Sequence, residues 1–396
     1  MKKVLFVIPT MRMGGAEQSL VSLLNMLDTS KYEIDLLLFE KKGELLGNIS
    51  PQINVLETDT VTTAMVLEFR YYFKQLLKEK KFGAAFVRLF ILLLSLIQHK
   101  LKINKILSWN IAKHFIKSYK KEYDVAIGYL EGAADFYVID KINAKKKIGW
   151  IHSDFSKQIR NLKAEAKYYE KFDRIAVISD ICRKNFVQCY PRLKNRALVI
   201  ENMSNYEWIQ KQSLKTIPDK IEEDMFYIVS VGRLEEVKGF DLAISAAELL
   251  KENGNRFIWH IFGDGSQRSI LQNQIDSLKI GNSIILKGTT SNPYMYMRRA
   301  DIIVQSSRYE GKSIVLDEAK FLGKPILVTN YPSAKDQITH EKTGIVVEIN
   351  AEGIAGGIEL LMKDDMLRNK LGKNCLECKK LEQGSIKKVE ALLDEN

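Results

Sequence analysis

The chain of 396 residues is 46% hydrophobic and 28% charged, a composition that is ordinary for a globular protein and excludes collagen-like, low-complexity and long disordered chains. Because this length exceeds what one hydrophobic core supports, we expect two domains. The formal net charge is +11, and residues 61–120 alone contribute +10, which indicates an anionic partner: nucleic acid, a membrane surface or a polyanionic substrate.

The first predicted elements are a buried strand over 3–9 and a helix over 16–27, joined by a turn that contains Gly14 and Gly15. Glycine lets the backbone approach a ligand closely, and the N–H groups at a helix start favour a phosphate. A plain tight turn between strand and helix uses glycine just as well. The glycine pair alone therefore leaves both alternatives open.

Further apolar runs predict strands, and the alternation of strands with helices indicates a doubly wound sheet. These strands are expected at 34–39, 55–57, 123–129, 147–151, 174–179 and 197–201. Residues 65–120, which hold the basic excess, have helical periodicity instead. His152 follows the strand at 147–151, and a histidine at the carboxyl end of a strand points towards a ligand cleft. The alternative for His152 is a partly buried histidine with a structural role.

Residues 205–220 lack sustained apolar periodicity, and we predict an interdomain linker there. A second α/β pattern follows, with strands at 226–231, 256–262, 283–287, 302–304 and 325–329 and helices at 241–252 and 266–280. The predicted organisation is an N-terminal domain over 1–204, a C-terminal domain over 221–380 and a helix over 381–396 that returns to the N-terminal domain. Two successive α/β domains predict a ligand site in a cleft between them.

Arg233 and Lys238 lie together on the connection that follows the strand at 226–231. The planar guanidinium and the compact ammonium can hold a diphosphate and stabilise charge that develops on a leaving phosphate. Taken alone, the pair is equally compatible with two solvated surface cations. The nearby FGDG at 262–265 begins like a dinucleotide fingerprint, but Arg268 replaces its last glycine, which argues against hydride transfer.

The segment over 301–325 breaks from a strand into a polar turn and restarts as a helix. Glu310 lies on the turn and Glu318 inside the helix, and both are expected near the carboxyl edge of the parallel sheet. Gly311 and Ser313 lie between them, where a helix start offers backbone N–H groups to an anion. The sequence has no Asp-x-Asp triplet, so cations and helix starts would take the electrostatic role of a divalent metal.

Four cysteines, and an N-terminus that leads into a strand, fit a reducing cytosol. Cys375 and Cys378 form a C-x-x-C, but no second Cys or His pair lies near them in sequence, so we predict no zinc site. The longest apolar run, residues 82–97, includes Arg88 and is shorter than the roughly twenty residues of a spanning helix. An interfacial helix remains open.

Several short motifs occur in one order along nearly the whole chain: GGAE at 14–17, WIHSD at 150–154, VGRLEEVKG at 231–239, FGDG at 262–265, and E-G-x-S-x4-E at 310–318 followed by A-x3-G-K-P. The sequence resembles the retaining glycosyltransferases of family 4, most strongly over 226–347. The resemblance implies the GT-B fold, an α/β architecture of two Rossmann-like, doubly wound domains facing a central cleft. It also implies a nucleoside-diphosphate sugar as donor and no cofactor or metal.

Carried over from the family pattern, Arg233 and Lys238 bind the donor diphosphate, Glu318 binds the ribose hydroxyls and Glu310 lies near the transferred sugar. His152 matches the histidine beside the sugar at the reacting centre. The remaining donor-binding residues that the resemblance implies are Gly14, Gly15, Gly263, Gly311, Lys312 and Ser313. Lys312 departs from the usual apolar residue, and an added phosphate or sugar contact and simple exposure both stay open for it.

The resemblance thus predicts a metal-independent retaining transfer of a sugar to a hydroxyl of a glycan or lipid-linked acceptor, in bacterial surface polysaccharide or glycolipid synthesis. We further expect residues 65–120 to dock the protein on the anionic inner face of the cell membrane, so that it is cytoplasmic and peripherally bound. The alternatives are a nucleotide-sugar epimerase of the same fold, and a basic nucleic-acid-binding protein. The epimerase needs no acceptor groove, and no nucleic-acid motif is recognisable, so we expect no nucleic-acid partner.

Overall fold

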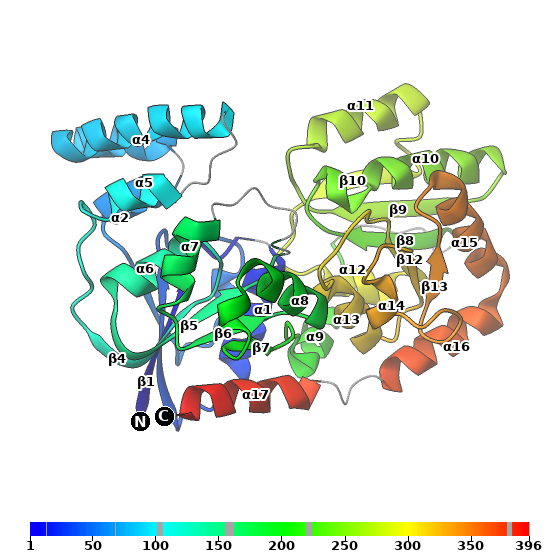
Figure 1. Cartoon of the computed structure of the whole chain (residues 1–396). Helices are drawn as coiled ribbons and strands as arrows, with labels where there is room; N and C mark the ends of the chain where they lie inside the picture. The colour runs from blue at the N-terminus through cyan, green and yellow to red at the C-terminus, as the bar shows by residue number, and fades with distance from the viewer. Residues whose placement is uncertain are drawn as a thin grey trace. The chain divides into compact units, whose positions relative to one another are not determined.

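The computed structural model describes residues 1–12, 14–67, 69–100, 106–153, 155, 162–218, 224–377 and 382–395. Contacts between Cα atoms divide the chain into two compact units (Figure 1). Unit 1 comprises Met1–Arg12, Leu23–Glu201 and Lys388–Asn396, and unit 2 comprises Met13–Ser22 and Asn202–Lys387. The C-terminal residues therefore belong to the same unit as the N-terminal strand.

In the described part of unit 1, seven parallel strands form one sheet in the order β3-β2-β1-β4-β5-β6-β7. Their bounds are β1 Lys2–Ile8, β2 Tyr32–Leu38, β3 Asn54–Glu57, β4 Glu122–Gly128, β5 Asn143–Ile151, β6 Arg174–Val177 and β7 Ala197–Val199. The central strands are continuous apolar runs because helices cover both faces of a parallel sheet. Strand order reverses between β1 and β4, which pair in parallel from Val4 with Val125 onwards.

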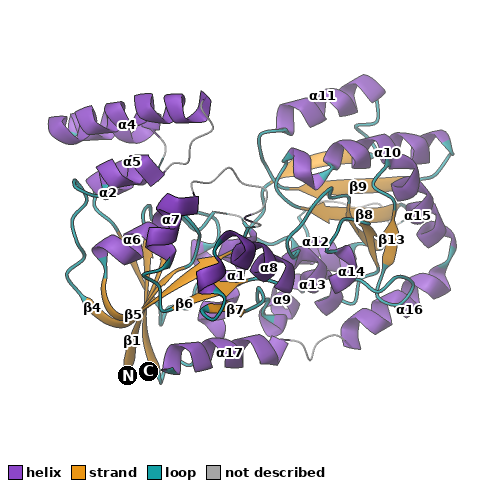
Figure 2. Ribbon diagram, in the orientation of Figure 1, coloured by secondary structure: helices purple, strands orange, loops and turns teal. Residues whose placement is uncertain are grey.

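The helices associated with unit 1 are α1 Gly15–Met26, which is counted with unit 2 up to Ser22, α2 Thr60–Val66, α3 Phe69–Lys78, α4 Phe82–Lys100, α5 Ile106–Ala112, α6 Ala133–Lys141, α7 Leu162–Tyr169 and α8 Asp180–Cys189. The predicted helical character of 65–120 is confirmed for α2 to α5 but is wrong for residues 113–120, which form turns and an irregular loop before β4. In this segment α4 packs against α3 and α5 (Figure 2).

Unit 2 has a six-stranded parallel sheet, among its described residues, in the order β10-β9-β8-β11-β12-β13. The strands are β8 Phe226–Val231, β9 Phe257–Phe262, β10 Ile284–Gly288, β11 Ile302–Gln305, β12 Ile326–Thr329 and β13 Ile345–Val347. Strand order reverses between β8 and β11, and in doubly wound sheets ligands bind at the carboxyl ends of the strands at such a switch point. The fold therefore directs attention to the loops after β8 and β11.

The helices of unit 2 cover the two faces of this sheet (Figure 2). They are α9 Tyr206–Ser213, α10 Phe240–Glu252, α11 Arg268–Leu278, α12 Tyr294–Arg299, α13 Ile314–Phe321, α14 Ala334–Gln337, α15 Ala351–Lys363 and α16 Asp365–Leu376, while α17 Glu382–Asp394 continues into unit 1. Two apolar cores result, because neighbouring residues of a strand face opposite sides. Ile302 and Val304 face the core under α10, α11 and α15, whereas Ile303 faces the core under α9, α12 and α13.

The prediction of a linker over residues 205–220 is wrong for Tyr206–Ser213, which form α9. Asn205 caps this helix, since its side chain accepts a hydrogen bond of 2.9 Å from the N–H of Trp208. Ile209 is buried in the core of unit 2, and Gln210 donates to the carbonyl of Phe321 at 2.6 Å. These contacts make the segment an integral part of unit 2.

Candidate functional site

Three of the predicted site residues lie on the two loops at the switch point of unit 2. Arg233 follows β8, and Lys238 ends the short 3₁₀ helix η4 (Glu236–Lys238) on the same connection. Glu310 lies on the turn after β11, the strand that pairs with β8. The Lys238 Nζ and the Glu310 Oε1 are 2.6 Å apart, with side-chain exposures of 17% and 11%. Adjacent parallel strands thus bring together two charges that are 72 residues apart in sequence.

The Glu310 carboxylate takes its hydrogen bonds on one oxygen. Besides Lys238, the side chains of Gln305 and Ser307 donate to Oε1, at 2.8 and 2.6 Å. The backbone carbonyl of Glu310 accepts from Ser333 at 2.7 Å. Oε2 makes no hydrogen bond within the described part of the chain. The carboxylate is therefore fixed through Oε1 and keeps Oε2 available to a ligand hydroxyl.

Arg233 differs from Lys238 in having no committed partner. Its side chain is exposed, and none of the described residues forms a hydrogen bond or an ion pair with the guanidinium. The charge of Arg233 contributes to lowering the pKa of Glu235, although the main cause is a hydrogen bond from Ser266. A guanidinium in this state can turn its fork of donors to phosphate oxygens without breaking an existing contact.

The start of α13 is held by side chains that leave its first N–H groups uncapped. Ser313 stands at the N-cap position, but its hydroxyl donates to Gln305 Oε1 at 2.7 Å and makes no cap hydrogen bond. Gln337 holds the Ser313 backbone from both sides, accepting from its N–H at 2.8 Å and donating to its carbonyl at 2.7 Å. The first N–H groups of a helix have no partner within the helix and suit an anion.

Two other predicted residues flank this helix start. Gly311 lies half-buried in the bend between Glu310 and α13. Lys312 Nζ is 3.8 Å from Asp317 Oδ2, and only 14% of its side chain is exposed. Lys312 is therefore not a freely solvated lysine.

Glu318, the second glutamate of the motif, is in a different environment from Glu310. It is 1% exposed, and Tyr294 donates a hydrogen bond of 2.8 Å to its Oε1. Oε2 is buried and makes no hydrogen bond with the described residues. Burial raises the pKa of this carboxyl to about 8, so the group is mainly neutral at pH 7. A buried oxygen of this kind fits a ligand hydroxyl, as the predicted ribose contact requires.

The glycines have separate explanations. Gly263 has a φ of +146°, and a Cβ there would lie 1.8 Å from the carbonyl oxygen of Gly232. Close packing of two loops therefore requires glycine at 263 whether or not a ligand binds. A Cβ at Gly14 would meet the Glu17 carboxylate at 2.2 Å, whereas one at Gly15 would meet nothing within 4 Å. Of these three glycines, Gly15 is the one with room for a Cβ.

His152 belongs to unit 1. Its backbone N–H donates to Glu131 Oε2 at 2.9 Å, directly after β5. Its ring lies 5.0 Å from the ring of Tyr129 and nearly parallel to that of Trp150, at 6.4 Å between centroids. The strand-end position that the sequence predicted is confirmed, while the catalytic role stays a prediction. Asp154 of the same motif lies outside the described residues.

Sequence reasoning missed the polar side chains that hold this site together: Tyr294, Gln305, Ser307, Ser333 and Gln337. Tyr294 begins α12, Gln305 ends β11 and Ser307 follows it, whereas Ser333 and Gln337 are the residue before α14 and the last residue of α14. The one available signal was the break of the apolar run Ile302–Val304 into three consecutive polar residues before Arg308. That pattern marks a strand end, but it does not indicate which partner each side chain takes.

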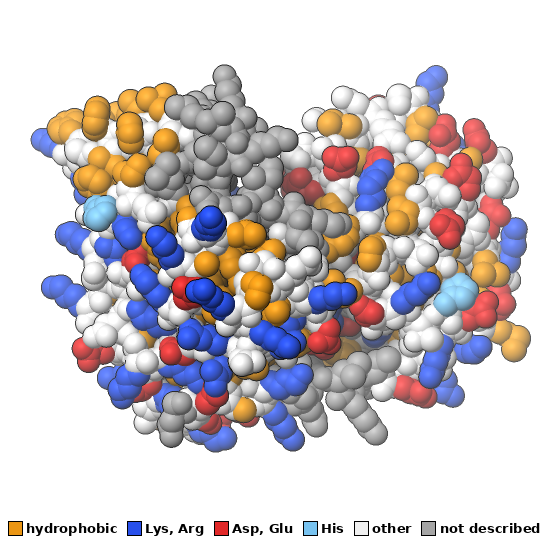
Figure 3. Space-filling model, viewed as in Figure 1, with side chains coloured by type: hydrophobic (Ala, Val, Ile, Leu, Met, Phe, Trp, Pro, Cys, Tyr) orange, Lys and Arg blue, Asp and Glu red, His pale blue; other side chains and the backbone are white. Residues whose placement is uncertain are grey.

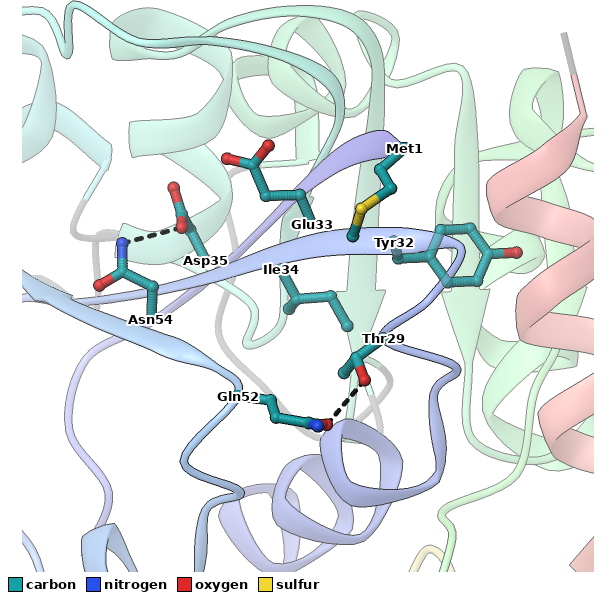
Figure 4. A pocket seen from close by; sticks show the side chains of 8 residues that line it. All are labelled: Met1, Thr29, Tyr32, Glu33, Ile34, Asp35, Gln52 and Asn54. Carbon is teal, nitrogen blue, oxygen red and sulfur yellow. Dashed lines mark hydrogen bonds between the residues drawn. The ribbon is translucent and has the colours of Figure 1, made fainter.

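A cavity in unit 1 does not belong to this site. It has a volume of about 290 Å³ and is lined by Met1, Thr29, Tyr32, Glu33, Ile34, Asp35, Gln52 and Asn54 (Figure 4). Asp35 is its most buried charge, and the side chains of Asn54, Lys121 and Tyr123 all bond to the carboxylate. The cavity lies at the end of β2 opposite to the carboxyl edge, so we assign no ligand to it.

The two doubly wound units define a class of fold that solved proteins share. A glycosyltransferase from Rickettsia africae aligns over 100% of this chain and 98% of its own, with a TM-score of 0.68 and 16% identity. HepE of Anabaena, in complex with UDP and glucose, aligns over 100% of both chains with a TM-score of 0.70 and 16% identity. TarM of Staphylococcus aureus reaches 0.67 at 17% identity over 100% of both. The protein has the GT-B fold.

Residues 213–377 match the family model described as Glycosyl transferases group 1. An N-acetylgalactosaminyltransferase of Campylobacter jejuni that acts on a diphospho-undecaprenol-linked sugar is 28% identical over 202 residues, 50% of this chain and 53% of its own. A poly(ribitol-phosphate) alpha-N-acetylglucosaminyltransferase of S. aureus is 28% identical over 149 residues, 37% of this chain and 30% of its own. The chain thus spans about half or less of the curated relatives it matches.

Proposed function

We propose that the protein is a metal-independent retaining glycosyltransferase of the kind found in family 4. It moves a sugar from a nucleoside diphosphate to a hydroxyl of a glycan or lipid-linked acceptor. The reaction belongs to the synthesis of a bacterial surface polysaccharide or glycolipid. The observation that carries the proposal is the cluster at the switch point of unit 2. There Lys238 pairs with Glu310 at 2.6 Å, Arg233 has no committed partner, and the neighbouring helix start is uncapped. The names of the relatives agree with this chemistry.

The residues divide the reaction between them. Arg233 and Lys238 bind the diphosphate and stabilise the charge that grows on it as the bond between C1 of the sugar and the phosphate oxygen breaks. The acceptor oxygen forms a new bond to C1 on the same face, and its proton passes to the departing phosphate oxygen. Glu310 Oε2 binds a hydroxyl of the transferred sugar, and Glu318 binds the ribose. No protein nucleophile is required in this scheme.

Donor hydrolysis without acceptor tests the proposal first. We expect slow hydrolysis of one nucleoside-diphosphate sugar from a panel, insensitive to EDTA, with release of the α-anomer from an α-linked donor. Arg233→Ala and Lys238→Ala should each lower turnover by about two to three orders of magnitude, as loss of a charge-stabilising donor does. Lys251→Ala is the control, because Lys251 is exposed and its ammonium donates to the carbonyl of Lys279 at the far end of α10. A strict requirement for a divalent metal, or near-normal turnover in both variants, contradicts the proposal.

Measurements of nucleotide binding distinguish the roles of Glu310 and Glu318. Glu318→Gln should weaken binding of the free nucleoside diphosphate, because the ribose contact is lost. Glu310→Gln should leave that binding intact and slow the transfer. His152→Ala should also slow the transfer without changing nucleotide affinity. Equal loss of nucleotide affinity in the two glutamate variants would rule out the division of roles.

We also propose that α3 and α4 bind the anionic membrane surface on which a lipid-linked acceptor would lie. Part of α4 is turned with its apolar side outwards: Phe82, Phe86 and Phe90 are 64%, 73% and 51% exposed, whereas Arg88 is 8% exposed. Leu89 and Leu93 extend the same stripe, and Figure 3 shows hydrophobic side chains gathered there. Exposed lysines of α3 and of the turn that follows accompany the stripe: Lys74, Lys78 and Lys80. Among the described helices, none is long and apolar enough to cross a bilayer.

Co-sedimentation with liposomes tests the membrane proposal. Each Lys or Arg near an anionic surface contributes on the order of 1 kcal/mol, screened within a Debye length, so binding to phosphatidylglycerol vesicles should fall near half-molar salt. Phosphatidylcholine vesicles should bind more weakly. Phe86→Ser should weaken binding to both, whereas Ile270→Ser, at an exposed apolar position of unit 2 (58% exposed), should not. Equal binding to the two kinds of vesicle, or none to either, refutes the proposal.

A further inference from the structure

We infer that Gln305 is a positioning residue for the proposed transfer, because its side-chain amide fixes both the Glu310 carboxylate and the Ser313 hydroxyl. The inference rests on the proposed function and adds to it a residue that contacts neither donor nor acceptor. Gln305 is the last residue of β11 and is 6% exposed. Its backbone pairs with Val328 of β12, and its carbonyl accepts from the Thr329 hydroxyl at 3.3 Å. The sheet therefore holds the base of this side chain.

Both polar atoms of the Gln305 amide form hydrogen bonds, the nitrogen as a donor and the oxygen as an acceptor. Nε2 donates to Glu310 Oε1 at 2.8 Å and lies 3.3 Å from Ser307 Oγ, while Oε1 accepts from Ser313 Oγ at 2.7 Å. A carboxylate at this position could accept from Ser313 but could not donate to Glu310, and a lysine could donate but not accept. The geometry thus selects a carboxamide.

The two contacts have separate consequences for the site. Donation to Oε1, together with the donors Lys238 and Ser307, leaves Oε2 as the oxygen of Glu310 that can take a sugar hydroxyl. The Ser313 hydroxyl is engaged by the amide and does not cap α13, but Gln337 holds the Ser313 peptide, so the helix start does not depend on Gln305. The effect of Gln305 on the transfer therefore runs through the Glu310 carboxylate.

The segment before α13 does not depend on Gln305 alone. Gln337 holds the Ser313 peptide through two hydrogen bonds, and Ser333 holds the Glu310 carbonyl. Replacement of Gln305 should therefore leave the backbone in place and release mainly the side chains of Glu310 and Ser313. The expected defect is a lower turnover number with nucleotide affinity nearly unchanged.

The test is a double-mutant cycle on hydrolysis of the nucleoside-diphosphate sugar that the wild type cleaves fastest. Gln305→Leu should lower kcat by about tenfold to a hundredfold, the range expected when a hydrogen bond to a charged group is lost. Affinity for the corresponding free nucleoside diphosphate should change by less than about threefold. In the Glu310→Gln background, Gln305→Leu should lower kcat by less than about twofold, because Gln305 acts through Glu310.

Two further variants keep the test decisive. Gln305→Glu preserves the shape but cannot donate to Glu310, so its kcat should fall as far as that of Gln305→Leu, even where the leucine variant folds poorly. Gln274→Leu is the control, since this half-buried amide bonds to the carbonyl of Asp241 and to Ser245, away from the cluster. If the losses of kcat in the Gln305 and Glu310 variants are additive, or if nucleotide affinity falls while kcat is unchanged, this inference is overturned and the proposed function is not. A wild type that cleaves no nucleoside-diphosphate sugar overturns the proposed function and this inference with it.

Discussion

At the scale of single residues, the two glutamates of the motif over 310–318 show how one short segment produces two unlike carboxyl groups. Glu310 is bonded to Lys238, Gln305 and Ser307 and keeps one oxygen for a ligand. Glu318 is enclosed in the core, and its only hydrogen bond among the described residues comes from Tyr294. Two carboxyl groups in unlike environments are typical of sites with divided roles.

Glu318 leads to a prediction about stability and pH. Its pKa in the folded chain, about 8, lies above the ordinary value of 4.5, so the folded state binds more protons between these values and loses stability as the pH rises through them. Glu318→Gln removes this loss. The free energy of unfolding of the variant relative to the wild type should therefore increase by up to about 1.4 kcal/mol per pH unit between pH 5 and 8.

Urea unfolding at pH 5, 6.5 and 8 measures this difference. Glu235→Gln is the control, because hydrogen bonds from Ser266 lower the pKa of Glu235 from its ordinary value of 4.5, the direction opposite to that of Glu318. A difference for Glu318→Gln that stays constant from pH 5 to 8 would show that Glu318 titrates normally.

Glycine positions give a second prediction at this scale. Gly263→Ala should destabilise the protein by more than about 3 kcal/mol, because its φ of +146° is strained for alanine and the Cβ would overlap the Gly232 carbonyl. Gly15 is the first residue of α1, and no atom lies within 4 Å of a Cβ built there. Gly15→Ala should therefore change the stability by less than about 1 kcal/mol. Thermal unfolding of the two variants compares them directly, and similar midpoints would contradict the geometry.

Sequence reasoning reached the charged residues of the site but not their supports. Arg233, Lys238 and Glu310 were predictable because each follows an apolar run that forms a strand, and the carboxyl ends of parallel strands share one edge. Gln305 and Gln337 were not, since the role of an amide depends on which donors and acceptors the folded sheet brings within 3 Å. Gly263 was predicted as a donor-binding glycine, and the structure supplies a packing reason that no motif carried.

At the scale of elements, strands were predictable to within one or two residues where they are buried on both faces. The run at 226–231 coincides with β8, and 302–304 lies within β11, whose residues are all buried. Sequence reasoning missed helix α9 because polar or charged residues interrupt its apolar pattern at positions 207, 210 and 211. The apolar side chains therefore do not recur with a clear helical period. Tertiary contacts through Ile209 and Gln210 stabilise it instead.

The N-cap of α9 gives a prediction at this scale. Asn205→Ala should lower the free energy of unfolding by about 1 kcal/mol, because the N–H of Trp208 loses its acceptor. Asn205→Asp retains the acceptor and should cost much less. Chemical unfolding followed by far-UV circular dichroism checks both, and equal losses would mean that the cap does not stabilise the helix.

At the scale of the whole molecule, unit 1 is assembled from sequence-distant parts. Val389, Leu392 and Leu393 of α17 are at most 4% exposed. The carbonyl of Leu393 accepts from Lys2 Nζ at 2.8 Å, and that of Leu392 accepts from Lys146 Nζ at 2.8 Å. The C-terminal helix is thus part of the packing of the first sheet.

Leu393→Ala should therefore destabilise unit 1 by about 2–5 kcal/mol, the usual range for a buried leucine. Amide hydrogen exchange should accelerate over 122–151 in unit 1 and stay unchanged over 226–262 in unit 2. Leu360→Ala, at a position of α15 that is 45% exposed, is the control and should alter neither region. Faster exchange in unit 2 alone would place the contribution of α17 elsewhere.

The placement of Lys388–Asn396 in unit 1 also sets an order of events on the ribosome. Synthesis proceeds at about 5–20 residues per second, so about 10 to 40 s separate the appearance of residue 201 from that of residue 388. Throughout this interval the newly made β1, β2 and β5 lack the helix that packs against their ends. Unit 2, whose last residues precede 388, can close first. The unit whose synthesis begins first is therefore the last to be completed.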